Sequence, residues 1–271
     1  MLYLKGVGKL APLIYITIFI CYNFAMENDN QDYEDFISTV SHELRTPLTS
    51  IKGFSQTMLS SWDKLDDENK KKFIKIIEQQ SQRLINLVEN MLAVTKLHSK
   101  NIFVYNPADI KPLIEQTIII VKSKYPDKSF KFNCNPNIPQ IFVDKDKFVQ
   151  IMTNLIENGA KYSIDGSDVV IIAEPKGDNV EIKVSNIGIG IEQKDYEKIF
   201  TKFSRIDNPL TRKVQGSGLG LFITKSLVEK MGGSISVKSQ KIDNSEYSDI
   251  TFTLLMPVKN IEEQTRIKCS Q

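Results

Sequence analysis

The chain has 271 residues, of which 41% are hydrophobic and 25% charged, as in ordinary globular proteins of one or two domains. A formal net charge of +2, without basic runs that alternate with aromatic residues, excludes a dedicated nucleic-acid binder. The three cysteines are odd in number and far apart, which excludes a disulfide framework or a zinc site and indicates free thiols: Cys21, Cys134 and Cys269.

Residues 1–31 form an N-terminal segment that contains a largely apolar run at residues 10–26. Its length of 17 residues is at the short end of what spans a bilayer. Two interpretations stay open, a membrane anchor and a truncated or misassigned start. Basic residues precede the run and acidic residues follow it, so the positive-inside preference would leave the N-terminus in the cytoplasm and send the remainder out.

Residues 32–98 predict two long helices, at about Asp32–Ser60 and Glu68–His98. Each carries one apolar stripe at helical or near-heptad spacing. Two such helices pack as an antiparallel hairpin. Because a hairpin alone leaves much of each stripe exposed, we expect a homodimeric four-helix bundle. An ordinary coiled-coil spacer would explain the stripes equally well.

His42 favours a functional hairpin over a spacer. At about 100° per residue, it lies roughly 160° from the centre of the apolar stripe, so we expect the imidazole to face solvent. Glu43 follows it directly, and Thr46 lies one turn further along the same face. Pro47 removes one helical hydrogen bond and predicts a bend just after the histidine.

Beyond a linker at residues 99–106, residues 107–258 alternate between helices and strands, and residues 259–271 form a polar tail. The expected helices are Ala108–Lys124, Lys145–Tyr162 and Leu219–Met231. The expected strands are Ser129–Asn133, Val169–Glu174, Val180–Asn186, Ser234–Ser239 and Asp249–Met256. Because they follow no regular strand–helix–strand rhythm, we expect an α/β fold with a mixed sheet covered on one face by helices.

Three polar side chains share one face of the expected helix Lys145–Tyr162: Asn154, Asn158 and Lys161. Carboxamide oxygens suit Mg²⁺ when phosphates and water supply its remaining ligands. The ammonium group of Lys161 adds a positive charge for those phosphates.

Two glycine clusters follow in the sequence. Gly188 and Gly190 come at a strand end, where a backbone without side chains can approach a flat base or a phosphate. The second cluster opens a helix whose free N–H groups favour anions: Gly216, Gly218, Leu219 and Gly220. Either cluster alone is a weak signal, because many turns contain two glycines. In this order, after a helix rich in asparagine, the clusters indicate a nucleotide site.

From about Asp32 to Val258 the chain resembles the kinase core of a two-component sensor histidine kinase. "SHELRTPL" resembles the H box, "NLIENGAKYS" the N box, "GIGI" the G1 box, "IFTKFSRID" the F box and "GSGLGLFITK" the G2 box, all in the family's order. The resemblance implies a dimerisation and phosphoacceptor hairpin followed by a Bergerat-type ATP-binding α/β sandwich.

The resemblance also implies the chemistry. Neutral His42 would attack the γ-phosphate of Mg-ATP while Glu43 accepts from its Nδ1–H, and Thr46 would orient water for the reverse, phosphatase reaction. Magnesium would bind through Asn158, and Tyr162 would pack against the adenine. The phosphoryl group would then pass to an aspartate on the receiver domain of a response regulator, acting in trans.

An ATP-dependent core belongs in the cytoplasm, which conflicts with the orientation that the charges around residues 10–26 favour.

A segment that begins with Phe200, Phe203 and Arg205 and reaches Gly216 resembles a lid over ATP.

Asn186 departs from the family, which has an aspartate there to accept a hydrogen bond from the adenine amino group. A hydrogen bond to a charged group contributes about 1.5–3 kcal/mol against roughly 1 kcal/mol for a neutral one, so ATP binding weakened by one or two orders of magnitude is expected. Two hypotheses follow. The first is an active kinase, and the second is a degenerate dimeric scaffold or phosphatase that binds a regulator.

Overall fold

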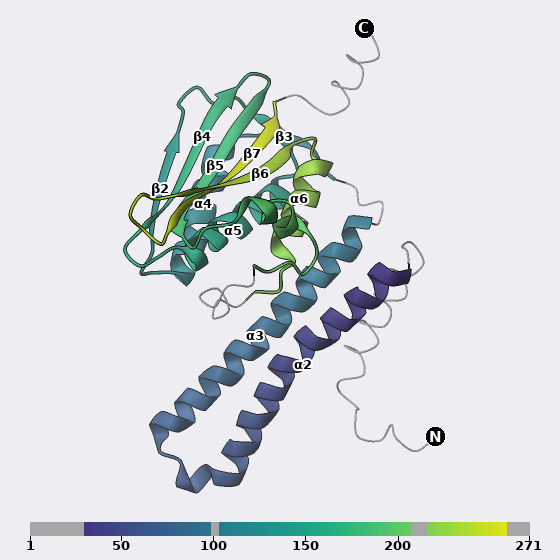
Figure 1. Cartoon of the computed structure of the whole chain (residues 1–271), viewed down its shortest axis with the longest axis vertical. Coiled ribbons are helices and arrows are strands. Elements are labelled where there is room, and N and C mark those ends of the chain that lie inside the picture. Colours follow the sequence, from purple (N-terminus) through teal and green to yellow (C-terminus); the bar gives the residue numbers. More distant parts are fainter. Residues whose placement is uncertain (1–29, 99–102, 207–215, 259–271) are drawn as a thin grey trace. The chain divides into compact units, whose positions relative to one another are not determined.

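The computed structural model describes residues 30–98, 103–206 and 216–258, which belong to two compact units, residues 1–100 and 101–271 (Figure 1). The anchor expected at residues 10–26 lies outside the described residues. Among the helices that are described, none has the length and apolar character that a bilayer crossing requires.

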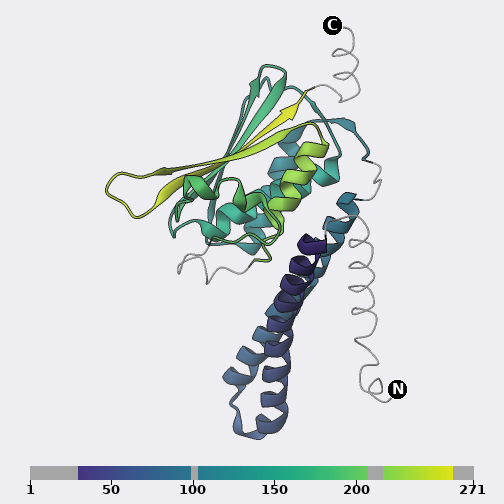
Figure 2. The same ribbon diagram turned by 45° about the vertical axis from the view of Figure 1, so that its right-hand side comes forward.

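The first unit is an antiparallel helical hairpin, with α2 at Asn30–Ser61, the 3-10 turn η1 at Trp62–Lys64 and α3 at Asp67–His98 (Figure 2). Asp66 begins α3 by accepting a hydrogen bond from the backbone N–H of Asn69 at 2.7 Å. The two predicted helices are therefore present, and α2 continues through Pro47 as one helix.

The hairpin buries only part of its apolar stripes. Val40, Leu87, Met91 and Val94 are buried between the helices. Large apolar side chains elsewhere on the hairpin stay exposed: Leu48, Leu59, Ile74 and Ile85. This is the exposure expected of a single hairpin.

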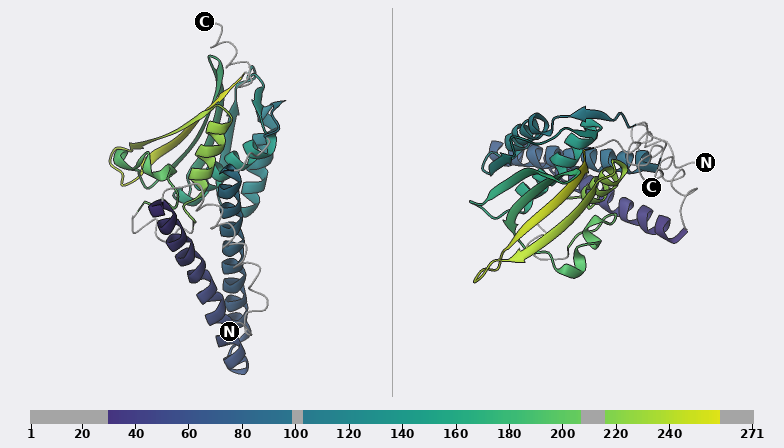
Figure 3. Two further views of the ribbon diagram at one scale, coloured as in Figure 1. Left: turned by 90° about the vertical axis from the view of Figure 1, so that its right-hand side faces the viewer. Right: turned by 90° about the horizontal axis from the view of Figure 1, so that it is seen from above.

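The second unit is a five-stranded mixed sheet with helices on one face, as predicted (Figure 1). The strand order is β2-β4-β5-β7-β6, in which β2 and β4 run parallel and all other neighbours antiparallel. The strands are β2 (Ser129–Cys134), β4 (Asp168–Lys176), β5 (Asn179–Gly188), β6 (Ser234–Lys241) and β7 (Ser248–Pro257). The covering helices are α4 (Ile110–Lys124), α5 (Lys145–Tyr162) and α6 (Gly220–Lys230) (Figure 3).

Helix α5 is the central element of the helical layer. Asp144 caps it by accepting from the backbone N–H groups of Asp146 and Lys147. Its inner face is buried without interruption: Phe148, Ile151, Met152, Leu155, Ile156, Gly159 and Ala160. A Cβ on Gly159 would lie 2.8 Å from Cγ1 of Val169, so the glycine lets α5 pack closely on β4. The buried face fixes which side chains of α5 point outward.

The segment expected as a linker, residues 99–106, ends at the first residue of a short strand. Residues Asn106–Ala108 form strand β1, which pairs antiparallel with β3 at Ile141–Val143. Pro107 is tolerated because the pair is only two strands wide and leaves an unpaired side. The hydroxyl of Tyr105 donates to the carbonyl of Lys230 at 2.8 Å, which ties this segment to the end of α6. Two further 3-10 turns, η2 at Gln193–Asp195 and η3 at Lys198–Phe200, complete the unit.

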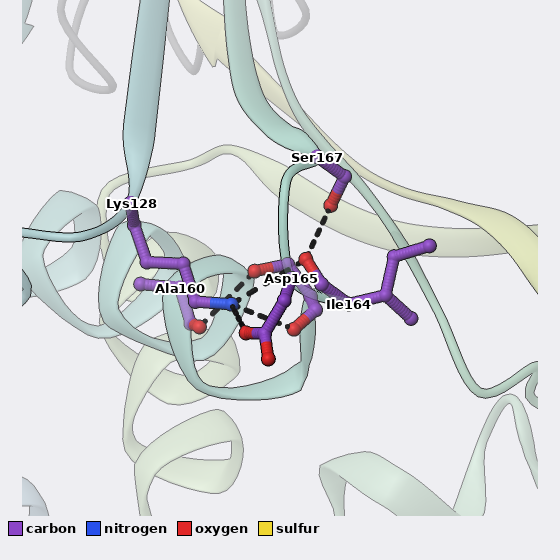
Figure 4. Close-up of polar contacts among 6 residues, drawn as sticks. Lys128, Ala160, Ile164, Asp165 and Ser167 are labelled. Carbon is purple, nitrogen blue, oxygen red and sulfur yellow. Dashed lines mark hydrogen bonds and ion pairs between the residues drawn. The ribbon is translucent and has the colours of Figure 1, made fainter.

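Lys128 binds the turn that follows α5 (Figure 4). Its ammonium group donates to the carbonyls of Ser163 at 3.0 Å and Ile164 at 3.4 Å and contacts a carboxylate oxygen of Asp165 at 3.1 Å. Within the turn, the hydroxyl of Ser167 donates to the carbonyl of Ile164 at 2.9 Å. Lys128 therefore holds the C-terminal end of α5 in place.

Replacing Lys128 by methionine should lower the free energy of unfolding by about 1–3 kcal/mol, because it leaves part-buried carbonyl oxygens without their donor. Urea denaturation measures the loss. Lys131→Met is the matched control on β2, since the Lys131 side chain is 63% exposed and its ion pair with Asp168 is screened by solvent. Equal losses in the two variants would contradict the role given to Lys128.

Candidate functional site

The predicted site residues fall into two groups, one in each unit. The second unit carries nine of them on α5, around the end of β5 and around the start of α6, which we call the α5 site: Asn154, Asn158, Lys161, Tyr162, Asn186, Gly188, Gly190, Gly218 and Gly220. The first unit carries His42, Glu43 and Thr46 on α2.

The three polar residues of α5 lie outside its buried face, as the spacing predicted. The amide Nδ2 of Asn154 donates to the hydroxyl of Thr224 on α6 at 2.8 Å. Asn158, one turn later, is half-buried. The Lys161 ammonium lies 3.7 Å from a carboxylate oxygen of Glu157, which also contacts Lys124 at 2.7 Å. Two lysines therefore share one carboxylate, and positive charge remains at this end of α5.

Helix α6 begins directly against Asn154. A Cβ on Gly220 would lie 2.3 Å from Oδ1 of Asn154, so a larger residue there would displace the Asn154 side chain. The first N–H groups of a helix have no partner within it and favour negative charge. The structure thus brings a side-chain amide of α5 beside an anion-favouring helix end, as "GSGLGL" predicted.

The residues before α6 pack on the F-box segment. Gly218 has a φ of +70°, and a Cβ there would lie 2.6 Å from the carbonyl carbon of Phe203. Leu219 is fully buried. Among the described residues, a Cβ on Gly216 would meet only the hydroxyl of Tyr162, at 4.0 Å. Arg212 and Lys213, the basic residues of the segment expected as a lid, lie outside the described residues.

The end of β5 closes against the end of α5. A Cβ on Gly188 would lie 2.2 Å from the carbonyl oxygen of Tyr162, and Ser163 forms a β-bridge with Gly188. Burial raises the pKa of the Tyr162 phenol, and the positive charge of Arg205 opposes this rise. The phenol therefore stays neutral and presents a half-buried ring.

Gly190 packs on the far strands of the sheet. A Cβ on Gly190 would lie 2.5 Å from the hydroxyl oxygen of Ser248 on β7. The backbone N–H of the next residue, Ile191, donates to the hydroxyl of Ser239 on β6 at 3.1 Å. These contacts hold the glycine loop after β5.

Asn186 is the polar residue of this region that stands out. Its side chain is 5% exposed, and its amide Nδ2 is buried without a hydrogen-bond partner among the described residues. The same amide nitrogen lies 3.1 Å from the place where a Cβ on Gly188 would be.

The side chains of the α5 site suit Mg²⁺ only if a bound ligand contributes further oxygen atoms. Within the described residues, no group of three His, Cys, Asp or Glu side chains could hold a metal. Asn158 offers a carboxamide oxygen, a hard ligand of the kind Mg²⁺ accepts. One amide oxygen holds the ion when phosphate oxygens and water complete its coordination.

On the hairpin, His42 is exposed as predicted. The carboxylate of Glu43 lies 3.1 Å from Nη2 of Arg83 on α3, and both side chains are 23% exposed. The hydroxyl of Thr46 donates to the backbone carbonyl of His42 at 3.3 Å. Pro47 is buried.

Two residues that contact predicted site residues were not themselves predicted from the sequence, Arg83 and Thr224. Arg83 pairs with Glu43 across 40 positions of sequence, a distance at which no local pattern signals contact. Thr224 is 1% exposed on the inner face of α6 and accepts from Asn154. A buried threonine in an otherwise apolar helix stripe was the available signal, since buried hydroxyls need partners.

Two family models match the chain. The model described as the His Kinase A (phospho-acceptor) domain matches residues 32–100, and the model of histidine kinase-, DNA gyrase B- and HSP90-like ATPases matches residues 143–260. The first contains His42, and the second contains the α5 site.

Curated relatives are similar over most of the chain. Sensor histidine kinase WalK of Bacillus subtilis is 32% identical over 262 residues, which cover 94% of this chain and 41% of WalK. Aerobic respiration control sensor protein ArcB of Escherichia coli is 30% identical over 248 residues, which cover 90% of this chain and 31% of ArcB. The chain therefore spans less than half the length of these relatives.

Solved structures share the fold. Histidine kinase ThkA, in complex with the response regulator protein TrrA, is 25% identical with a TM-score of 0.66, over 83% of this chain and 61% of that chain. Histidine kinase AdeS of Acinetobacter baumannii is 22% identical with a TM-score of 0.60, over 81% of this chain and 98% of that chain. These similarities agree with the expected helical part followed by an α/β sandwich.

Replacing Gly188 by alanine should lower the free energy of unfolding by about 1–3 kcal/mol, because the new methyl group meets the Tyr162 carbonyl and neither backbone can move cheaply. Thermal or urea unfolding measures the change. Gly216→Ala is the control, because a methyl group there meets no described atom closer than 4.0 Å. It should leave stability unchanged or raise it slightly, since alanine lowers the conformational entropy of the unfolded chain. If the two variants unfold alike, the close approach of β5 and α5 is wrong.

Proposed function

The chain belongs to the family of two-component sensor histidine kinases, and from this membership we propose that it phosphorylates itself on His42 from Mg-ATP and passes the phosphoryl group to an aspartate of a response regulator. The observation that carries the proposal is an exposed histidine in the segment that the phosphoacceptor model matches. The family model of ATPases matches the segment that contains the α5 site, which supports this site as the place where ATP binds.

In the proposed reaction, Nε2 of neutral His42 attacks the γ-phosphorus of ATP. The Nε2–phosphorus bond forms as the bond to the bridging oxygen of the β-phosphate breaks, and ADP leaves. The carboxylate of Glu43 takes the proton from Nδ1. Glu43 lies on the same helix as His42. Its carboxylate is restrained by the contact with Arg83 at 3.1 Å. Phosphoryl transfer depends mainly on such positioning and on charge neutralisation.

The α5 site has the groups to bind a nucleoside triphosphate. Lys161 and the N-terminus of α6 favour the phosphate charges, and Asn158 would hold magnesium. Magnesium supplies charge neutralisation on the phosphates when bound. The ring of Tyr162 and the open backbone at Gly188 and Gly190 suit a flat base.

Because the proposed reaction needs ATP, we place this part of the protein in the cytoplasm. The membrane anchor at residues 10–26 stays a prediction.

We propose a homodimer through the hairpin. Leu59 is 84% exposed, Ile74 52% and Ile85 50%, although all three are large apolar residues on helices. Burying them against a second copy would complete the four-helix bundle that the stripes predict. ThkA was solved with its response regulator, which supports a receiver domain as the second partner. Thr46, exposed beside His42, would orient water in dephosphorylation of that partner.

Incubation with Mg²⁺ and γ-labelled ATP should place an acid-labile, base-stable label on the chain, and His42→Gln should abolish it. His98→Gln is the matched control, since it replaces the other histidine of the chain and should keep the label. Absence of label at millimolar ATP, with dephosphorylation of a regulator retained, would instead support the degenerate scaffold or phosphatase.

Glu43→Gln keeps the size of the side chain and removes the base. The rate of autophosphorylation should fall by about 10²–10⁴-fold, the usual contribution of a positioned general base. The affinity for ATP should not change, because Glu43 lies on the hairpin. Single-turnover labelling measures the rate, and nucleotide titration measures the affinity. A rate close to that of the parent chain would remove Glu43 from the mechanism.

A further inference from the structure

Asn186 occupies an inward position of β5. The inward side chains of this strand alternate with outward ones, and Val180, Ile182 and Val184 precede Asn186 on the same face. Those three are apolar and buried. A carboxamide at the next inward position is therefore a polar group where the pattern calls for an apolar one.

The structure leaves this carboxamide without a protein partner for its donor. The side chain is 95% buried, and Nδ2 makes no hydrogen bond within the described part of the chain. A buried donor without an acceptor is unfavourable, so most such groups are satisfied by water or a ligand. Asn186 lies in the α5 site, beside Gly188 and the end of α5, which points to a ligand.

The chemistry of a carboxamide decides which base it can pair with. A carboxylate presents only acceptors, whereas a carboxamide presents one acceptor and one donor. Adenine offers a 6-amino donor, and a 6-oxopurine offers an acceptor at O6. On the Watson–Crick edge, adenine adds an acceptor at N1 and a 6-oxopurine adds a donor there. Asn186 can therefore form two complementary hydrogen bonds with either base by turning its amide.

We propose that Asn186 makes the base subsite of this protein accept 6-oxopurine nucleoside triphosphates alongside ATP. The inference rests on the proposed function, since it assigns the base to the site that holds the triphosphate. A carboxylate in the same place would repel O6, because two acceptors would face each other. A site that must leave a buried polar group unpaired rejects a ligand strongly, whereas a site that pairs with both ligands discriminates weakly.

Inosine triphosphate is the probe, because it differs from ATP only at position 6 and in the protonation of N1. Calorimetric titration of the full chain with ATP and with inosine triphosphate, both with Mg²⁺, should give dissociation constants within about tenfold of each other. Asn186→Asp should weaken inosine triphosphate tenfold or more relative to ATP. Ser185→Ala is the control, because Ser185 lies on the opposite face of β5, where its hydroxyl is hydrogen-bonded to that of Thr251 at 2.8 Å. The ratio of the two dissociation constants in this variant should match that of the parent chain.

The outcomes separate the two proposals. If the parent chain binds ATP but binds inosine triphosphate more than about a hundredfold more weakly, the base inference is overturned and the proposed function stands. An unchanged ratio in Asn186→Asp, with thermal melting showing a folded protein, overturns the inference as well. If neither nucleotide binds, the proposed function falls and the inference falls with it. The ratio in the parent chain tests the inference even if the variant fails to fold.

Discussion

The close approach of three glycines to α5 and to the F-box segment determines how the second unit is arranged. Gly188 meets the Tyr162 carbonyl, Gly220 meets the Asn154 amide oxygen, and Gly218 meets the backbone of Phe203, each at a distance that leaves no room for a Cβ. The apolar inner face of α5 fixes that helix on the sheet. The end of β5 and the start of α6 both contact α5, so α5 determines where these two segments lie.

On the hairpin, one ion pair adds to the apolar contacts between the helices. Glu43 and Arg83 belong to different helices, and their contact joins the two helices beside His42. A partly exposed ion pair contributes little to stability because solvent screens it. Its more important effect is to restrict the carboxylate to one region of the hairpin surface. The histidine itself keeps an exposed side chain, which the proposed transfer of a phosphoryl group to and from it would require.

Local sequence patterns predicted the elements but not their long-range partners. The bounds expected for α5 are those observed, because Asp144 caps its start and its apolar spacing continues to Ala160. Strands β1 and β3 were missed since three residues carry no readable periodicity. The Arg83 contact and the Thr224 partner of Asn154 depend on tertiary packing. The sequence showed that Asn186 is unusual, but only the structure shows that its Nδ2 has no hydrogen-bond partner within the described residues.

That missing partner bears on whether Asn186 marks a lost activity or an altered one. In a site that had lost its nucleotide, a buried amide would gain by pairing with its own chain, since leaving it unpaired costs about 1–3 kcal/mol. Here Nδ2 has no partner in the part of the chain that the structure describes, while Gly188 packs so closely on α5 that a Cβ would lie 2.2 Å from the Tyr162 carbonyl oxygen. The close packing around Asn186 is therefore retained beside one changed hydrogen-bonding group. The proposed change in base recognition gives the unpaired donor a partner in the ligand, which loss of nucleotide binding does not.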